Sequence, residues 1–473
     1  MTELMQFFID GAWRDPLASR SHPVVNPATE QPMYSVALGS RGDVDVAVAA
    51  AKRAFETHSM GHAERVALLE RLIEAYQART KDLAAAVSDE MGAPIVFAEH
   101  FQVKSGLNNL IATLNALKAF KFEERMGSAL VLREAVGVVG MITPWNWPLN
   151  QITAKVAPAL AAGCAMILKP SELTPSSASI FAEIIDQAGV PRGLFNLVNG
   201  LGPEVGTALS EHGDVDMISF TGSTKAGIDV AQRAARTVKR VGQELGGKSP
   251  NIILESPKFE DAVSGGARYL FNNAGQSCIA PSRMLVPISL MNDAAAIAKR
   301  VADDIRVGDP RSTDTQMGPV VSETQWNKIQ DFINSGIDEG ASLVTGGPGR
   351  PAGINRGYYV RPTVFAEVAN DMTIAREEIF GPVLAIIGYR DTDEAIRIAN
   401  DTPYGLGGYV SAGTLDEALD VARRIRAGTV NVNGAVFDRA APFGGYKQSG
   451  NGREWGKIGL EEFLEFKAIA GAA

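Results

Sequence analysis

The stretch Val138-Val-Gly-Met-Ile-Thr-Pro-Trp-Asn-Trp-Pro148 decides the fold class. Its first five residues form a short apolar run that is typical of a buried strand. Pro148 then opens an alanine-rich segment, which predicts a helix that ends at Gly163. The pattern repeats at once, because Ala165-Met-Ile-Leu168 predicts a second strand and Thr174-Pro175 predicts the N-cap and first turn of a second helix.

The same alternation continues through the next part of the chain. Apolar runs at 194–198 and 215–220 predict two more strands, and helices are expected to begin at Pro203 and Lys225. Strands and helices that alternate across such short links predict a parallel, doubly wound α/β sheet. Ligands bind such sheets beyond the carboxyl ends of the strands, so the loops that follow the strands are the candidate binding site.

Composition narrows the class of protein. A chain of 473 residues predicts two or three domains with ample core. The net charge of −9 disfavours nucleic acid and anionic membranes as partners. Two cysteines predict a reducing compartment, and the acids among the first ten residues do not suit an export signal, so we expect a cytoplasmic enzyme. The uncharged run 135–154 contains two prolines and three amide side chains, so we predict no membrane span there. We also predict no metal site.

Two of the loops carry polar residues suited to a dinucleotide. Lys169 can donate to a ribose hydroxyl, and Glu172 can accept from the 2′-hydroxyl while repelling a 2′-phosphate, which favours NAD over NADP. The alternative is a solvated turn pair. Ser223 lies directly before a helix, where its hydroxyl and the backbone N–H groups suit a phosphate. The run 200–206 is one residue longer than the usual dinucleotide fingerprint, and a plain turn at a helix start explains it equally well.

Cys278 is a candidate nucleophile because it is one of only two cysteines. A free cysteine is more commonly a small buried hydrophobe, and this alternative stays open on the cysteine alone. All five histidines lie upstream in polar contexts that suggest the surface. A carboxylate is therefore favoured as the base, and Glu244 is the candidate to examine.

Five motifs in a fixed order reveal a family resemblance: Pro144-Trp-Asn-Trp-Pro148, Phe220-Thr-Gly-Ser-Thr224, Glu244-Leu-Gly-Gly-Lys-Ser-Pro250, Gly275-Gln-Ser-Cys278 and Glu378-Ile-Phe-Gly-Pro-Val383. With them the chain resembles the aldehyde dehydrogenase superfamily, of the NAD(P)-dependent, non-acylating kind. The resemblance runs from Phe8 near the start to Gly450 near the end.

The resemblance implies a mechanism. Cys278 would attack the aldehyde, and the Asn146 amide with the Cys278 backbone N–H would hold the alkoxide. Glu244 would then act as general base for hydrolysis of the thioester, which favours release of a free acid over transfer to coenzyme A. Lys155 and Glu454 match positions linked to proton relay, and a structural ion pair is the alternative.

The resemblance also implies NAD as cofactor, whose positively charged ring would favour the thiolate. The residues at positions that contact the cofactor are Ile142, Trp145, Lys169, Glu172, Gly202, Ser223, Leu245, Glu378 and Phe380.

The expected substrate is a small-molecule aldehyde, and a semialdehyde-specific enzyme is the alternative within the family. Residues expected to line the substrate path are Trp147, Gln151, Ala154, Ser277, Ile279, Phe437 and Phe443. Arg439 could meet an acidic aldehyde, but we expect it to point to solvent and to pair with Asp438 beside it.

The implied fold is α/β, with a Rossmann-type doubly wound cofactor domain (1–116 and 136–245), an α/β catalytic domain (246–448) and a small oligomerisation arm (117–135 and 460–473). Such an arm predicts a homodimer or homotetramer, with Glu465 in a structural role at the interface. Two other classes remain open at this point. One is a thioester-forming cysteine hydrolase, and the other is a binding protein that keeps the fold without catalysis.

Overall fold

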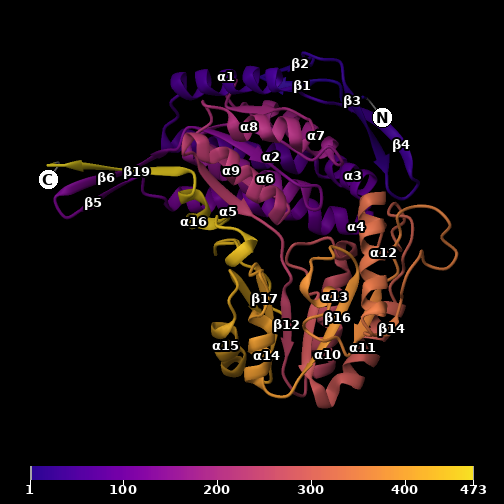
Figure 1. Cartoon of the computed structure of the whole chain (residues 1–473). Coiled ribbons are helices and arrows are strands. Elements are labelled where there is room, and N and C mark those ends of the chain that lie inside the picture. The colour runs from indigo at the N-terminus through magenta and orange to yellow at the C-terminus, as the bar shows by residue number, and fades with distance from the viewer. Residues whose placement is uncertain (1–2, 472–473) are drawn as a thin grey trace.

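The computed structural model describes residues 3–471. Residues 1–2, at the start of the expected cofactor domain, and 472–473, at the end of the expected arm, lie outside the described part. The chain forms two α/β lobes, and a narrow arm projects away from both (Figure 1). Among residues 3–471, no helix has the length and apolar character needed to cross a bilayer.

The first lobe is built on a seven-stranded sheet. Across the sheet the strands are β11 (Arg240–Glu244), β10 (Met217–Thr221), β7 (Val138–Ile142), β8 (Ala165–Lys169), β9 (Phe195–Leu197), β1 (Phe7–Ile9) and β2 (Ala12–Arg14). The five adjacent strands from β11 at one edge to β9 are parallel. Every residue of β7, β8 and β10 is buried, so helices cover both faces of the sheet. The predicted doubly wound sheet is confirmed.

The predicted helices after β7 and β8 are also present, as α6 (Pro148–Ala162) and α7 (Pro175–Gln187). Gly163 ends α6 in the left-handed conformation, as its position predicts. Thr174 occupies the N-cap of α7, but its side chain makes no capping hydrogen bond there. Its ψ of 58° departs from the extended backbone that usually aims an N-cap hydroxyl at the first turn.

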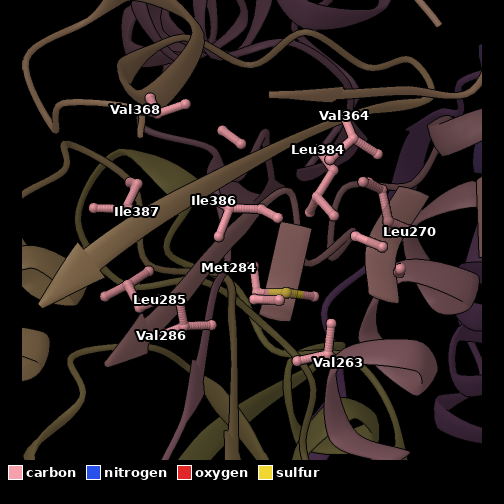
Figure 2. Packing of buried hydrophobic residues seen from close by; sticks show 14 of the residues in the cluster. Val263, Leu270, Met284, Leu285, Val286, Val364, Val368, Leu384, Ile386 and Ile387 are labelled. Carbon is pink, nitrogen blue, oxygen red and sulfur yellow. The ribbon is translucent and has the colours of Figure 1, made fainter. Parts of the chain in front are cut away.

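The second lobe has its own seven-stranded sheet, which is parallel except for one edge strand. Across the sheet the strands are β14 (Ser342–Thr345), β15 (Thr363–Ala366), β16 (Val383–Tyr389), β13 (Arg283–Pro287), β12 (Pro250–Ile253), β17 (Gly407–Ser411) and β18 (Thr429–Val432). Its buried core draws only on residues between Ile252 and Ile425. In Figure 2, Met284 of β13 lies in this core with its register partner Ile386 of β16.

The arm is a three-stranded antiparallel sheet in the order β19 (Leu464–Ala470), β6 (Ala129–Ala135), β5 (Glu123–Met126). Figure 1 shows it extending from the first lobe, with the end of the chain at its tip. Glu465 Oε1 lies 2.8 Å from Nη2 of Arg240 in β11, and this ion pair joins the base of the arm to the first sheet. Phe466 keeps 59% of its surface exposed, so the arm presents apolar groups outside this chain's own core.

Helices and a hairpin complete the two lobes. They are β3 (Ser21–Asn26), β4 (Gln31–Ala37), α1 (Arg41–Thr57), α2 (His62–Ala78), α3 (Thr80–Met91), α4 (Ile95–Phe97), η1 (Ala98–Val103), α5 (Lys104–Ala119), η2 (Gly202–Gly206), α8 (Thr207–Glu211), α9 (Thr224–Ala234), η3 (Ala235–Thr237), α10 (Phe259–Phe271), η4 (Asn272–Gly275), η5 (Ile288–Leu290), α11 (Met291–Asp303), α12 (Glu323–Asp338), α13 (Thr373–Arg376), α14 (Thr392–Asn400), α15 (Leu415–Arg424), η6 (Lys447–Ser449) and α16 (Gly456–Glu461).

A buried carboxyl joins three of these elements and predicts a pH-dependent stability. Glu90 of α3 accepts from the Tyr34 hydroxyl of β4 and from the Ser176 backbone N–H of α7. Burial raises the pKa of Glu90 to about 8. An unfolded chain loses this proton near its ordinary value of 4.5, whereas the folded chain keeps it. The contribution of the neutral carboxyl to the free energy of unfolding therefore falls as pH rises from 4.5 through 8.

We expect Glu90→Gln to remove this dependence, because the amide stays neutral. Over that pH range, the free energy of unfolding of the wild-type chain falls by at most about 5 kcal/mol through this group. Thermal unfolding should give similar Tm values for the two proteins at pH 5.5 and a higher Tm for Glu90→Gln at pH 9. Parallel declines in Tm for both proteins would contradict the assignment.

Candidate active site

The candidate catalytic residues meet where the two sheets face each other. Glu244 is the last residue of β11 and Asn146 follows β7, so both lie at the carboxyl edge of the first sheet. Cys278 lies in the loop before β13, at the amino edge of the second sheet. Contacts between the motifs, described below, join these two edges.

Two glycines make this approach possible. A Cβ atom at position 247 would lie 2.4 Å from the Cys278 carbonyl oxygen, and one at position 246 would lie 2.3 Å from a Glu378 carboxylate oxygen. Glu378 in turn accepts the Gly247 backbone N–H at 2.9 Å. The pair Gly246-Gly247 therefore lets the backbone after Glu244 pass against both the nucleophile loop and Glu378.

A group of buried amides holds Asn146 in place. Its Nδ2 donates to the Gln276 carbonyl at 3.1 Å, and its own carbonyl accepts from Gln102 and Asn273, each at 3.0 Å. Asn273 and the following Ala274 have φ values of 55° and 53°, which is strained for residues with a Cβ atom. Such strain directly before Gly275-Gln-Ser-Cys278 is typical of a functional loop that its surroundings hold fixed.

The surroundings of Cys278 favour the neutral thiol over the thiolate. Burial raises the pKa of this thiol, and the carboxylates of Glu378, Glu244 and Glu454 raise it further. The other cysteine, Cys164, is fully buried. Cys278 alone combines partial exposure with a place among candidate catalytic groups.

Glu244 has the environment of a strong base. Both of its carboxylate oxygens are enclosed and make no hydrogen bond to any residue in 3–471. Burial and the neighbouring Glu454 raise the pKa of Glu244, against smaller opposing effects of Lys155 and Arg453. Lys155 Nζ lies 2.6 Å from Glu454 Oε1, and the lysine side chain is 1% exposed. The two candidate relay residues thus form a buried ion pair that acts electrostatically on Glu244.

The expected cofactor residues lie along the carboxyl edge of the first sheet. Lys169 ends β8 and is buried, and its Nζ lies 3.2 Å from Glu172 Oε2, so the pair is not a fully solvated one. Ser223 caps α9 by accepting the Ala226 N–H, which leaves its hydroxyl hydrogen for another acceptor. Ile142 ends β7, Gly202 begins η2, and Leu245 follows β11.

Two expected cofactor residues at the other side of the site contact each other. The rings of Trp145 and Phe380 are 5.4 Å apart and perpendicular. Phe380 has a φ of 59°, an uncommon backbone conformation for an aromatic residue. The loop before β16 therefore holds this ring under strain beside the loop after β7.

Unpaired polar atoms on this edge fit a dinucleotide. Thr143 Oγ1, both amide atoms of Asn199 and Thr221 Oγ1 are enclosed without a partner among the described residues. These residues follow or end β7, β9 and β10. Buried polar atoms are nearly always satisfied, so hydroxyl and phosphate groups lying along this edge would supply the partners that the protein lacks. Among residues 3–471, no group of three His, Cys, Asp or Glu side chains could hold a metal ion.

The residues expected to line the substrate path form two groups. Trp147 Nε1 donates to Ser277 Oγ at 2.8 Å, which places this indole beside the nucleophile loop. Phe437 and Phe443 lie 6.5 Å apart, and Phe443 stacks on Trp455 at 4.6 Å. Of the others, Gln151 and Ala154 lie buried on α6, and the Ile279 carbonyl accepts the Tyr409 hydroxyl.

The expectation for Arg439 is wrong. Its guanidinium lies against α5 and α6, where it donates to Asn109, Asn150 and Ser105. Asp438 instead accepts the Ala440 N–H at 2.9 Å. The Asp438 carboxylate thus accepts from the backbone of its own turn. The acceptors of Arg439 lie far from it along the chain, so the local sequence does not predict them.

Comparison with known proteins agrees with this geometry. A sequence model described as "Aldehyde dehydrogenase family" matches residues 13–469. The chain belongs to this family. As an aldehyde dehydrogenase it is an oxidoreductase. It is 53% identical over 473 residues to a 3-succinoylsemialdehyde-pyridine dehydrogenase from Pseudomonas sp, covering 100% of this chain and 99% of the relative.

Solved structures extend the likeness to three dimensions. A cysteine-to-alanine mutant of aldehyde dehydrogenase C from Pseudomonas syringae, in complex with NAD+ and octanal, has a TM-score of 0.98 and 52% identity, covering 99% of this chain and 97% of that one. An aldehyde dehydrogenase from Bartonella henselae has a TM-score of 0.98 and 48% identity, covering 99% and 100%. The expected α/β fold of this aldehyde dehydrogenase is confirmed.

Proposed function

We propose that the protein oxidises an aldehyde to the free carboxylic acid with NAD as the hydride acceptor. The observation that carries the proposal is the position of Glu244, whose enclosed, unpaired carboxyl acts electrostatically on Cys278 across the meeting edges of the two sheets. The orphaned polar atoms along the first sheet and the NAD+ complexes of related structures support the choice of cofactor.

Cys278 begins the reaction. Its sulfur forms a bond to the carbonyl carbon, and the thiol proton leaves toward a base. The carbonyl oxygen becomes an alkoxide, which accepts from an Asn146 Nδ2 hydrogen and from the Cys278 backbone N–H. NAD, when bound, supplies the hydride acceptor and a positive charge that favours the thiolate. The product on the enzyme is a thioester at Cys278.

Glu244 completes the reaction. As a carboxylate it takes a proton from water, the hydroxide oxygen attacks the thioester carbon, and the Cys278 sulfur leaves. The Lys155–Glu454 pair lies close enough to influence Glu244 electrostatically and would carry its proton onward. Because water is the acceptor, the product is a free acid.

The test is a coupled assay of NADH formation and acid release. We expect butanal and NAD to give NADH and butanoate in equal amounts. A cysteine hydrolase that uses no redox chemistry would form no NADH. NADH formation that requires coenzyme A would contradict hydrolysis as the release step.

A semialdehyde is the second candidate substrate class. It is favoured by the name of the 53% identical relative, a 3-succinoylsemialdehyde-pyridine dehydrogenase. The octanal bound in the Pseudomonas syringae structure favours a plain aldehyde instead. A substrate panel ranked by kcat/KM separates the two classes.

Glu172 predicts a preference for NAD over NADP. A carboxylate at this position accepts from a ribose 2′-hydroxyl and repels a 2′-phosphate. We expect kcat/KM to be at least about tenfold higher with NAD, since about 1.4 kcal/mol of repulsion suffices. Glu172→Gln should reduce the NAD-to-NADP ratio of kcat/KM by raising kcat/KM with NADP. An unchanged ratio in Glu172→Gln would remove Glu172 from cofactor selection.

We further propose that the arm pairs with a second copy of the chain. Strand β19 lies at the edge of the arm's sheet, so its outer backbone groups remain available for pairing. The exposed Phe466 and Ile469 supply apolar surface on the same strand. A dimer or tetramer by light scattering is the expected result, and a monomer would contradict it.

A further inference from the structure

Arg439 lies in a polar cage between two helices. Its Nη1 donates to the Asn109 and Asn150 side-chain oxygens, and its Nη2 donates to Ser105 Oγ at 2.8 Å. Ser105 and Asn109 belong to α5, whereas Asn150 belongs to α6. Ser105 and Asn109 also bond to Asn150 directly, so the cage is fixed independently of the arginine.

An aromatic layer connects this cage to the expected substrate path. The Arg439 guanidinium carbon lies 4.4 Å from the ring centre of Trp455, and Trp455 stacks on Phe443. Trp455 has φ 72° and ψ 154°, a conformation that costs about 1–3 kcal/mol for a residue with a side chain. The fold sustains this strain directly after Glu454 of the buried ion pair, and the result is a ring held against Arg439.

The charge of Arg439 lacks a counter-ion among the described residues. All three acceptors are neutral, and no carboxylate in residues 3–471 forms an ion pair with this guanidinium. Glu454 influences it electrostatically, but that carboxylate pairs with Lys155. Burial lowers the pKa of Arg439 to about 10, so the group remains a cation at neutral pH. A partly buried cation of this kind is stabilised by an anion or a strong acceptor.

One edge of the guanidinium remains free. No described residue accepts from Arg439 Nε, and this atom is not fully enclosed. The Nη2 group has donated one of its two hydrogens. Nε–H and the second Nη2 hydrogen are the two donors that hold a carboxylate side-on.

A chain of contacts joins Arg439 to the nucleophile loop, beginning with its hydrogen bond to Asn150 of α6. Asn150 of the cage is followed by Gln151, and α6 begins after Trp147, which donates to Ser277 next to Cys278. A molecule bound at Cys278 that extends along the first turn of α6 therefore leads toward the Arg439 cage.

We propose that Arg439 is a specificity-determining residue that binds a second oxygen-bearing group of the substrate, a carboxylate or ketone remote from the aldehyde carbon. The inference rests on the proposed aldehyde oxidation and names its substrate class. Asn109, Asn150 and Ser105 hold three of the guanidinium hydrogens and thereby orient its free edge. The semialdehyde acid presents two carboxylate oxygens and the keto aldehyde one neutral carbonyl oxygen, and both kinds of oxygen accept from these N–H groups.

The test compares kcat/KM with NAD for butanal, 4-oxobutanoate and 4-oxopentanal. We expect the wild-type enzyme to prefer one or both oxygen-bearing aldehydes. Arg439→Met should lower their kcat/KM by about 10- to 100-fold, mainly through KM, because hydrogen bonds to a charged group are lost. Butanal should change by less than about threefold. Loss with 4-oxobutanoate alone identifies a carboxylate, and loss with 4-oxopentanal as well identifies any carbonyl-type oxygen.

Arg350→Met is a matched control, because Arg350 also lies over a tryptophan, Trp326, at 5.1 Å and far along the chain from the cage. It should leave all three values unchanged. Equal losses on all three aldehydes in Arg439→Met would show a structural role and overturn the proposal, as would no loss. If Arg439→Met does not fold, equal wild-type values for the three aldehydes overturn it. Absence of NADH with every aldehyde, butanal included, contradicts the proposed function instead.

Discussion

Cys278→Ala is expected to abolish NADH formation with every aldehyde. Without the sulfur no bond forms to the carbonyl carbon, and an unactivated aldehyde gives up hydride poorly. We expect kcat to fall by about 10⁴-fold or more, which is the scale for loss of a covalent nucleophile. Steady-state absorbance of NADH measures this directly. Cofactor binding should survive, and quenching of tryptophan fluorescence by NAD measures it independently, because Trp145 contacts the Phe380 ring in the expected cofactor site.

Cys164→Ala is the matched control. Cys164 is fully buried, and its Sγ contacts the Phe463 carbonyl behind α6 rather than the site. Its replacement leaves a small cavity that should cost about 1 kcal/mol of stability, with kcat unchanged. Comparable activity losses in both variants would show that Cys278 contributes through packing and would refute its role as nucleophile.

The sequence predicted β7, β8, β9 and β10 of the first sheet because each is a short apolar run between helix signals. The run 138–142 is fully buried on both faces, as a continuous apolar pattern requires. The sequence did not predict β11 at one edge of that sheet, or β1 and β2 at the other. Pairing of Phe8 with Leu197 joins residues 189 positions apart by sequence number, and nothing local to either strand encodes it.

The site was predictable where chemistry demands a residue type and unpredictable where position alone creates the role. Motifs predicted Cys278, Glu244 and Asn146 as candidates. Gln102 and Asn273, which hold the Asn146 backbone, carry no local signal, because a buried amide and a surface amide look alike in sequence. The expectation for Arg439 was wrong for the same reason. It considered only Asp438, the neighbour along the chain, whereas the acceptors of the guanidinium come from α5 and α6.

Glu244→Gln is expected to stop the enzyme after one turnover. The amide cannot take a proton from water, so the Cys278 thioester persists while its formation continues. Rapid mixing should show a burst of NADH close to one per active site, followed by a steady rate lowered by about 10²–10⁴-fold. Mass spectrometry of the quenched protein should show the acyl group on Cys278. If both the NADH burst and the steady turnover are lost, Glu244 is needed for formation of the thioester rather than for its hydrolysis.

The pH dependence of that steady rate gives a second readout. Burial and Glu454 raise the pKa of Glu244, so the carboxyl is neutral in acid and becomes the active carboxylate as pH rises through the raised value. If hydrolysis limits turnover, the wild-type rate should climb across this range, and the Glu244→Gln rate should lose that limb. Glu90→Gln is the matched control, since it neutralises another buried carboxyl with a raised pKa that contacts Tyr34 and Ser176 and none of the catalytic candidates. Glu90→Gln should show the same rise of rate with pH as the wild type, because this rise reports the one carboxyl that must lose its proton for water to attack.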